Sequence, residues 1–237
     1  MRFNSIALQF PIFNFEEGEV LLFDKPITWT SFDVVNKVRH TIRTKKVGHA
    51  GTLDPLATGL LVLCTGKMTK QIDTIQATEK EYLATITLGK TTPSYDLETE
   101  FDSETDITHL SEAQVAEAIM SYVGNQMQMP PMYSALKVDG KRLYKLARKG
   151  KEIELQPRPV SIYSIEIKSI SLPTVQFLLR CSKGTYIRTL AHDIGQQLGV
   201  GAHLSALRRT KVGHLSVEDA YDLPAFVEYI KKISPNF

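Results

Sequence analysis

The stretch HAGTLDPLATG, residues 49–59, places a single carboxylate, that of Asp54, among glycines, threonines and a proline. Glycine and proline favour turns, so we predict a loop that ends where the apolar run LLVLC, residues 60–64, begins a buried strand. A free aspartate has a pKa near ~3.9 and is ionised at neutral pH. From these residues alone, two interpretations of Asp54 are open. It caps a turn before Pro55, or it is a covalent nucleophile that a cation holds in place.

The segments around this loop predict a mixture of strands and helices. Thr30 with Asp33, and Ser111 with Gln114, each have the spacing of a capping box at the start of a helix. Alternating apolar residues over 81–89 predict a strand with Tyr82 on one face. Further strands are predicted at 20–23, 160–170 and 174–182, and a further helix within 183–199. Because strands and helices do not alternate strictly, we predict an α+β fold with a mixed, largely antiparallel sheet, not a Rossmann fold.

Charge is distributed unevenly along the chain. The net charge is only +2, and 43% hydrophobic with 23% charged residues is typical of a soluble globular protein. Residues 91–117 contain eight acids and no Lys or Arg, whereas residues 137–151 contain seven basic residues and one acid. We therefore expect an acidic surface excursion and a basic segment that attracts phosphates, with a merely solvated surface as the alternative.

Several kinds of site are disfavoured by the residues. Lys67 is followed by Met68, where a phosphate-binding P-loop requires Ser or Thr. The six histidines show no HExxH pattern and no cysteine partners, so no metal site is predicted. Nothing indicates a second acid beside Asp54, which a paired-carboxylate hydrolase would need. Cys64 and Cys181 lie in apolar runs and are predicted to be buried free thiols, and the absence of a leader or membrane span predicts a cytoplasmic protein.

Five segments resemble the TruB-type tRNA pseudouridine synthases. In chain order they are DKPITWTSFDVV (24–35), GHAGTLDPLATGLL (48–61), KEYLATITLG (80–89), PPMYSALKVDGKRLYKLARKG (130–150) and CSKGTYIRTLAHDIGQQLGVGAHLSALRRT (181–210). The resemblance extends over roughly residues 20–213. It implies a pseudouridine synthase fold with a basic insertion near 125–152. It also implies that the T-loop uridine 55 of tRNA is isomerised to pseudouridine, with no cofactor or metal.

The resemblance also implies roles for individual residues. Asp54 is the nucleophile, attacking C6 of the base or C1′ of the ribose; Arg188 pairs with it, and Tyr82 stacks on the target base and helps to remove the C5 proton. The residues it places around the substrate are His49, Tyr186, Leu207 and Lys25, of which Lys25 is expected to act as structural support. From the basic run 137–151, Lys137, Lys141 and Arg142 are expected to hold T-arm phosphates.

The sequence departs from the family pattern at two places. Thr28 stands where Gly is usual, and the chain ends about 24 residues after Gly213, too few for a complete C-terminal PUA domain. We therefore expect one catalytic domain over residues 1–237 that binds the T-arm of tRNA as a monomer, with no protein partner and no membrane. Two other functions are possible: a T-arm binding or folding module with secondary or no catalysis, and an RNA glycosidase that releases free uracil.

Overall fold

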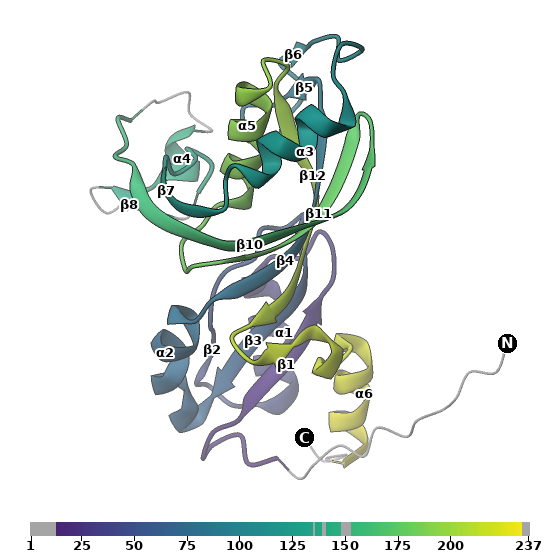
Figure 1. Ribbon diagram of the computed structural model, residues 1–237. Coiled ribbons are helices and arrows are strands. Elements are labelled where there is room, and N and C mark those ends of the chain that lie inside the picture. Colours follow the sequence, from purple (N-terminus) through teal and green to yellow (C-terminus); the bar gives the residue numbers. More distant parts are fainter. Residues whose placement is uncertain (1–12, 135, 139–140, 148–152, 234–237) are drawn as a thin grey trace, which may run out of the picture.

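The computed structural model describes residues 13–134, 136–138, 141–147 and 153–233. Its largest element is a nine-stranded sheet with the order β1-β3-β12-β4-β11-β10-β7, to which β2 adds at β3 and β13 at β12 (Figure 1). The strands are β1 (Val20–Lys25), β2 (Val47–His49), β3 (Thr58–Thr65), β4 (Lys80–Leu88), β7 (Gly124–Gln128), β10 (Arg158–Ser171), β11 (Thr174–Cys181), β12 (Ala202–Val212) and β13 (Leu215–Ser216). Among the described strands of this sheet, β3 and β12 pair in parallel and all other pairs are antiparallel, which confirms the predicted mixed, largely antiparallel sheet.

Helices cover the two ends of this sheet (Figure 1). They are α1 (Ser31–Ile42), α2 (Ile72–Ala77), α3 (Glu112–Met120), α4 (Leu143–Ala147), α5 (Ile187–Gln197) and α6 (Leu223–Ile233), with short 3₁₀ turns at Gly66–Gln71 and Val217–Asp219. One core lies between α3, α5 and the β4, β11 and β10 strands, around Phe177 and Ile86. A second lies between α1, α6 and the β1 and β3 strands, around Phe23 and Phe226.

Several local predictions are confirmed. Thr30 and Ser111 are the N-caps of α1 and α3, and both predicted capping boxes form. Alternate residues of β4 are buried from end to end. The first two of these, Lys80 and Tyr82, line a cavity, and the residues from Tyr82 onward belong to the core. A single strand thus contributes both to the core and to a cavity wall. Cys64 and Cys181 are buried free thiols, as predicted.

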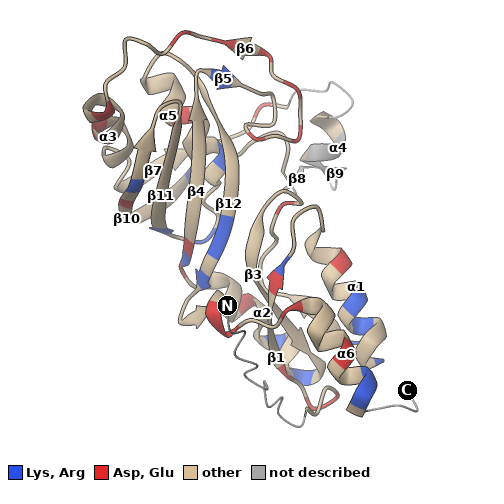
Figure 2. Cartoon of the chain, turned by 90° about the vertical axis from the view of Figure 1, so that its right-hand side faces the viewer, with Lys and Arg blue, Asp and Glu red and all other residues tan. Residues whose placement is uncertain are grey.

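The prediction that residues 91–117 form an acidic surface segment is wrong for the first part of that range. Two short strands, β5 (Lys90–Thr91) and β6 (Ser103–Glu104), pair with each other, but the loop between them turns inward. The Leu204 N–H of β12 donates to the Tyr95 carbonyl, and this bond draws Asp96 into the protein, where it is 5% exposed. Other acidic residues lie along the outside of this segment and on α3, whereas Lys and Arg lie on α1 and β12 (Figure 2).

The predicted insertion also begins later than expected. Residues 124–128 form β7, an edge strand of the main sheet, so the segment that leaves the sheet starts after Gln128. It contains a small hairpin of β8 (Lys137–Val138) and β9 (Lys141–Arg142), followed by α4. The turn predicted at Asp139-Gly140 lies outside the described residues. Over the described ranges, none of the helices combines the length and the apolar character needed to cross a membrane.

Gly59 offers a test of how the two parallel strands are joined. It has a φ of +95°, and a Cβ at this position would lie 2.3 Å from the backbone oxygen of Arg209 on β12. We expect Gly59→Ala to lower the free energy of unfolding by more than the roughly 1–3 kcal/mol of an unfavourable φ alone, because the strands would also have to separate. The control is Gly124→Ala on β7, where φ is +119° and an added Cβ would meet no atom of a non-neighbouring residue within 4 Å. Urea unfolding of both variants measures the difference, and equal losses would contradict this prediction.

Candidate active site

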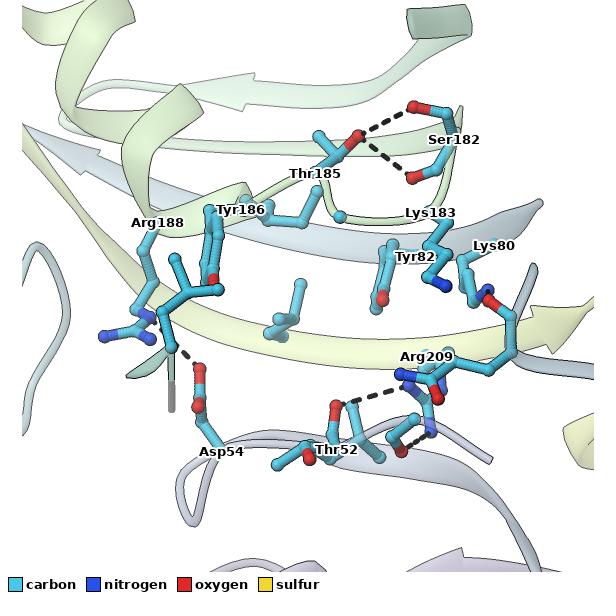
Figure 3. A pocket seen from close by; sticks show the side chains of 17 residues that line it. Thr52, Asp54, Lys80, Tyr82, Ser182, Lys183, Thr185, Tyr186, Arg188 and Arg209 are labelled. Atoms are coloured by element: carbon cyan, nitrogen blue, oxygen red, sulfur yellow. Dashed lines mark hydrogen bonds and ion pairs between the residues drawn. The ribbon is translucent and has the colours of Figure 1, made fainter. Parts of the chain in front are cut away.

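A cavity of about 310 Å³ opens where the 49–59 loop faces the sheet and the start of α5 (Figure 3). In Figure 3, Asp54 and Arg188 lie at one end, and Tyr82, Lys80 and Lys183 lie at the other. The lining residues are Gly51, Thr52, Leu53, Asp54, Gln76, Lys80, Tyr82, Leu136, Ser182, Lys183, Gly184, Thr185, Tyr186, Ile187, Arg188, Leu207 and Arg209. The cavity therefore combines a carboxylate, several cations and two tyrosines within one concave space.

The loop that carries Asp54 is fixed on its inner side. The Ser31 hydroxyl at the start of α1 accepts a hydrogen bond from the Leu53 N–H (2.8 Å) and donates to the Leu53 carbonyl (3.1 Å). On the other side of Asp54, the Thr28 N–H donates to the Pro55 carbonyl at 2.8 Å. The residues on both sides of Asp54 are thus bonded to the start of α1 and the turn before it, so the carboxylate has a defined position.

Arg209 of β12 is a second anchor for this loop. Its side chain is 1% exposed, and its guanidinium donates to three carbonyls, those of Leu60 (2.7 Å), Gly51 (3.1 Å) and Thr52 (3.4 Å). A buried charge is tolerated when its hydrogen bonds are satisfied, and a guanidinium keeps its charge at any working pH. Arg209 therefore joins the loop to the centre of the sheet.

Arg188 holds the Asp54 carboxylate. Its Nε lies 3.1 Å from Asp54 Oδ2 and 3.5 Å from Asp96 Oδ2, and its side chain is only 4% exposed. The two terminal nitrogens donate to the carbonyls of Ser94 (3.3 Å) and Tyr133 (2.9 Å). Arg188 is the second residue of α5, where the helix dipole disfavours a cation, so these acceptors must compensate for that position.

The Asp54 carboxylate faces the cavity with its side chain 41% exposed. Burial within the cavity raises its pKa above the ordinary range, and the nearby negative charge of Asp96 acts in the same direction. The Arg188 guanidinium opposes both effects by stabilising the ionised form. The result is a carboxylate that is accessible from the cavity and paired with a buried cation, an arrangement that suits a nucleophile.

The opposite wall of the cavity comes from β4 and β12. Tyr82 is 9% exposed and lies beside Arg209 in the antiparallel β4–β12 pair, where Ala84 faces Leu207. Burial raises the pKa of the Tyr82 phenol, which therefore stays protonated at neutral pH. Burial also lowers the pKa of Lys80 to about 8. An aromatic ring and a leucine on this wall can hold a flat base opposite the carboxylate.

The structure thus brings into one cavity Asp54, Arg188, Tyr82, Tyr186 and Leu207, the residues to which the family resemblance assigns roles at a common site. It does not place every candidate in the cavity.

Lys25 is fully buried, and its ammonium donates to the carbonyls of Pro26 (2.9 Å), Trp29 (2.6 Å) and Pro55 (3.2 Å). Burial lowers its pKa to about 8. These contacts hold the loop from beneath and leave no group of Lys25 facing the cavity. His49 ends β2 and is not among the cavity-lining residues, and burial lowers its pKa, which favours the neutral ring. Lys137, Lys141 and Arg142 belong to the β8–β9 hairpin, and their side chains lie outside the described part of the structure.

Three residues of the site were missed. Asp96 is the second acid that the sequence did not indicate, and nothing local predicts that its loop turns inward. Lys80 was detectable, because it lies two residues from Tyr82 on a predicted strand and alternate residues of a strand share a face, whereas Arg209 lies on β12, for which no strand was predicted. Among the described residues, no group of three or more His, Cys, Asp or Glu is arranged to hold a metal ion.

Two family models match this chain. The TruB family pseudouridylate synthase (N terminal domain) model matches residues 39–187, and the tRNA pseudouridylate synthase B C-terminal domain model matches residues 188–233. The chain belongs to the TruB family. This membership confirms the resemblance drawn from the five sequence segments and makes the chain a pseudouridylate synthase, an isomerase.

Curated relatives agree with the TruB assignment over nearly the whole chain. The chain is 52% identical over 223 residues to the tRNA pseudouridine synthase B of Phocaeicola vulgatus, a match that covers 92% of this chain and 95% of that protein. It is 49% identical over 222 residues to the protein of the same name from Flavobacterium johnsoniae, with 91% and 97% covered.

Solved structures confirm the pseudouridine synthase fold of this TruB-family chain. It matches a chain of a Cbf5-Nop10-Gar1 complex with a TM-score of 0.71 and 29% identity. It matches a chain of an H/ACA RNP bound to a substrate RNA containing 2′-deoxyuridine with a TM-score of 0.71 and 27% identity. Each match covers 94% of this chain but only 57% and 56% of the respective solved chains, so this chain spans little more than half of their length.

The Arg188–Asp54 pair can be tested by titration. Because the guanidinium lowers the pKa of Asp54, we expect Arg188→Gln to raise that pKa further, so that the carboxylate protonates at a higher pH. The measurement is ¹³C NMR of labelled aspartate carboxyls, with Asp54→Asn identifying the signal. Arg208→Gln is the control, because it removes the guanidinium that pairs with Asp24 at 2.6 Å, away from the cavity. An Asp54 pKa that is the same in Arg188→Gln and in the unmodified protein would refute the assignment.

Proposed function

We propose that this TruB-family enzyme converts uridine 55 in the T-loop of tRNA to pseudouridine, with Asp54 as the covalent nucleophile. The observation that carries the proposal is the position of Asp54: its carboxylate faces the cavity and is paired with a cation that is 4% exposed. That the substrate is tRNA is supported by the printed name of the relatives, tRNA pseudouridine synthase B. Uridine 55 follows from the resemblance of the loop and of the four other segments to the family.

The reaction is an isomerisation, so no group has to be supplied from outside. The Asp54 carboxylate forms a bond to C6 of the uracil or to C1′ of the ribose, and the C1′–N1 bond breaks. The uracil rotates, C1′ bonds to C5, the bond to Asp54 is released, the C5 proton leaves and N1 gains a proton. Both routes require an ionised carboxylate, and the Arg188 guanidinium stabilises that form.

A uridine within a folded T-loop must leave its stack before Asp54 can reach it. Extruding a base costs a few kcal/mol, and stacking on an aromatic ring returns about 1–3 kcal/mol. Tyr82 is the aromatic wall of the cavity, and Leu207 lies on the neighbouring strand. In this proposal the base lies between Tyr82 and Asp54, and the protonated Tyr82 hydroxyl relays the C5 proton, accepting it on oxygen as its own proton passes to solvent.

The basic hairpin supplies the contacts to RNA outside the cavity. Leu136, which lines the cavity, directly precedes the β8–β9 hairpin that carries Lys137, Lys141 and Arg142. We propose that these three cations hold phosphates of the T-arm, which would make binding weaken as salt is added. In this arrangement the protein acts on tRNA as a monomer in the cytoplasm.

Tritium release from a T-arm stem-loop labelled at C5 of uridine tests the nucleophile. We expect Asp54→Asn to lower the rate at least about 10³-fold, because the amide neither attacks carbon nor carries charge. Asp24→Asn is the matched control, since Asp24 pairs with Arg208 outside the cavity and should retain activity.

Further measurements in this assay distinguish the proposed function from the two alternatives, a T-arm binding module and a glycosidase. An RNA with cytidine at position 55 should release no tritium. Binding without release by the unmodified protein would leave a T-arm binding module, and free uracil among the products would indicate a glycosidase.

Tyr82→Phe separates the ring of this residue from its hydroxyl. Because the ring remains, we expect the affinity for the stem-loop to stay within about threefold, while the single-turnover rate falls about 10²–10⁴-fold, the usual range for a lost proton-transfer group. Tyr82→Leu should also weaken binding, because the stacking surface is lost. A Tyr82→Phe enzyme with the unmodified rate would show that the hydroxyl takes no part.

A further inference from the structure

The buried side chain of Gln128 binds the backbone of Tyr186 through two hydrogen bonds. The Gln128 Nε2 group donates to the Tyr186 carbonyl at 3.0 Å, and the Tyr186 N–H donates to Gln128 Oε1 at 2.8 Å. Gln128 is 5% exposed. A reversed amide would face donor with donor and acceptor with acceptor, so this pair of bonds fixes the orientation of the side chain.

These two bonds act at the point where α5 begins. Tyr186 is the N-cap residue of α5, and its own side chain makes no capping bond. Its carbonyl also accepts the first helical hydrogen bond, from the Leu190 N–H at 3.1 Å. The Gln128 amide therefore fixes the residue from which the first turn of the helix is built, and Arg188 is the second residue of that turn.

Gln128 is itself firmly held. It is the last residue of β7, and its backbone pairs with Arg158 of β10 in the main sheet. Directly after it the chain leaves the sheet toward the basic hairpin, and five residues later the Tyr133 carbonyl accepts a hydrogen bond from Arg188 Nη2 at 2.9 Å. The same segment thus contacts both the backbone that carries Arg188 and the guanidinium itself.

We propose that Gln128 is a positioning residue that holds Arg188 in place against Asp54. Through Gln128, the segment that leads from β7 to the basic hairpin is connected to the Asp54 carboxylate. The proposal rests on the function proposed above, because it assigns Gln128 a part in keeping Asp54 ionised and in place. Gln128 touches no reacting atom. Its contribution is geometric, since displacing a catalytic group by about 1 Å costs about 10²-fold in rate.

Gln128→Met keeps the length and burial of the side chain but removes both hydrogen bonds to Tyr186. The matched control is Gln126→Met on the same face of β7, where the Gln126 amide donates to Tyr122 and not to α5. Gln128→Glu is a second variant, in which the acceptor for the Tyr186 N–H is retained and the donor is lost. Urea unfolding of all three variants establishes that each is folded at the assay temperature.

The readout is single-turnover tritium release from the T-arm stem-loop, measured over a range of pH at saturating enzyme. We expect Gln128→Met to lower the rate about 10–100-fold with the dissociation constant for RNA within about threefold. We also expect the acidic limb of its rate profile to move to higher pH, in the same direction as in Arg188→Gln, because a displaced guanidinium stabilises the carboxylate less. The double variant Gln128→Met/Arg188→Gln should lose little more than Arg188→Gln alone.

Four results would overturn the proposal: no loss of rate in Gln128→Met, a rate loss equal at every pH, a loss confined to RNA affinity, or an equal loss in Gln126→Met. If the proposed function itself is wrong, the assay gives a different result. In that case Asp54→Asn retains turnover, whereas an Asp54-dependent enzyme that is insensitive to Gln128→Met contradicts only this inference.

Discussion

The structure of the site depends on one buried guanidinium. Arg188 lies in the first turn of α5, almost without solvent, where its charge is unfavourable unless acceptors surround it. Its acceptors are Asp54, Asp96, and the carbonyls of Ser94 and Tyr133, which come from three chain segments far apart in sequence. Satisfying one buried cation therefore brings the loop, the inward turn of the acidic segment and the base of the basic hairpin to a single place.

A nucleophile on a loop needs more support than one on a strand, because loops are intrinsically mobile. The support comes from buried cations that bind backbone carbonyls: Lys25 at Pro55, and Arg209 at Gly51, Thr52 and Leu60. Because these cations bind carbonyls and not carboxylates, they fix the loop without neutralising Asp54. The Asp54 carboxylate pairs with Arg188 on the side that faces the cavity.

The features that the sequence predicted are local. The capping box of Thr30, the alternation around Tyr82 and the helix within 183–199 each depend on a few neighbouring residues, and each is confirmed. The association of Asp54 with Arg188 came from the family resemblance and not from any local pattern. Strand β12 was not predicted, because register shifts between Leu204 and Ala206 and between Arg209 and Lys211 interrupt its alternation.

Buried cations explain most of what sequence reasoning missed at the site. Lysine and arginine are normally exposed, so a pattern that assigns charged residues to the surface places Lys80 and Arg209 outside. In this fold both lie on the cavity side of β4 and β12, among the carbonyls of the loop and the strand ends. Asp96 was missed for a related reason: its position follows from a backbone bond between Tyr95 and Leu204, more than a hundred residues apart. These buried charges are tolerated because carbonyl oxygens accept hydrogen bonds from Lys80 and Arg209, and because carboxylates and carbonyl oxygens surround Arg188. Arg188 in turn pairs with the Asp54 carboxylate, so the position of that carboxylate depends on groups supplied by distant parts of the chain.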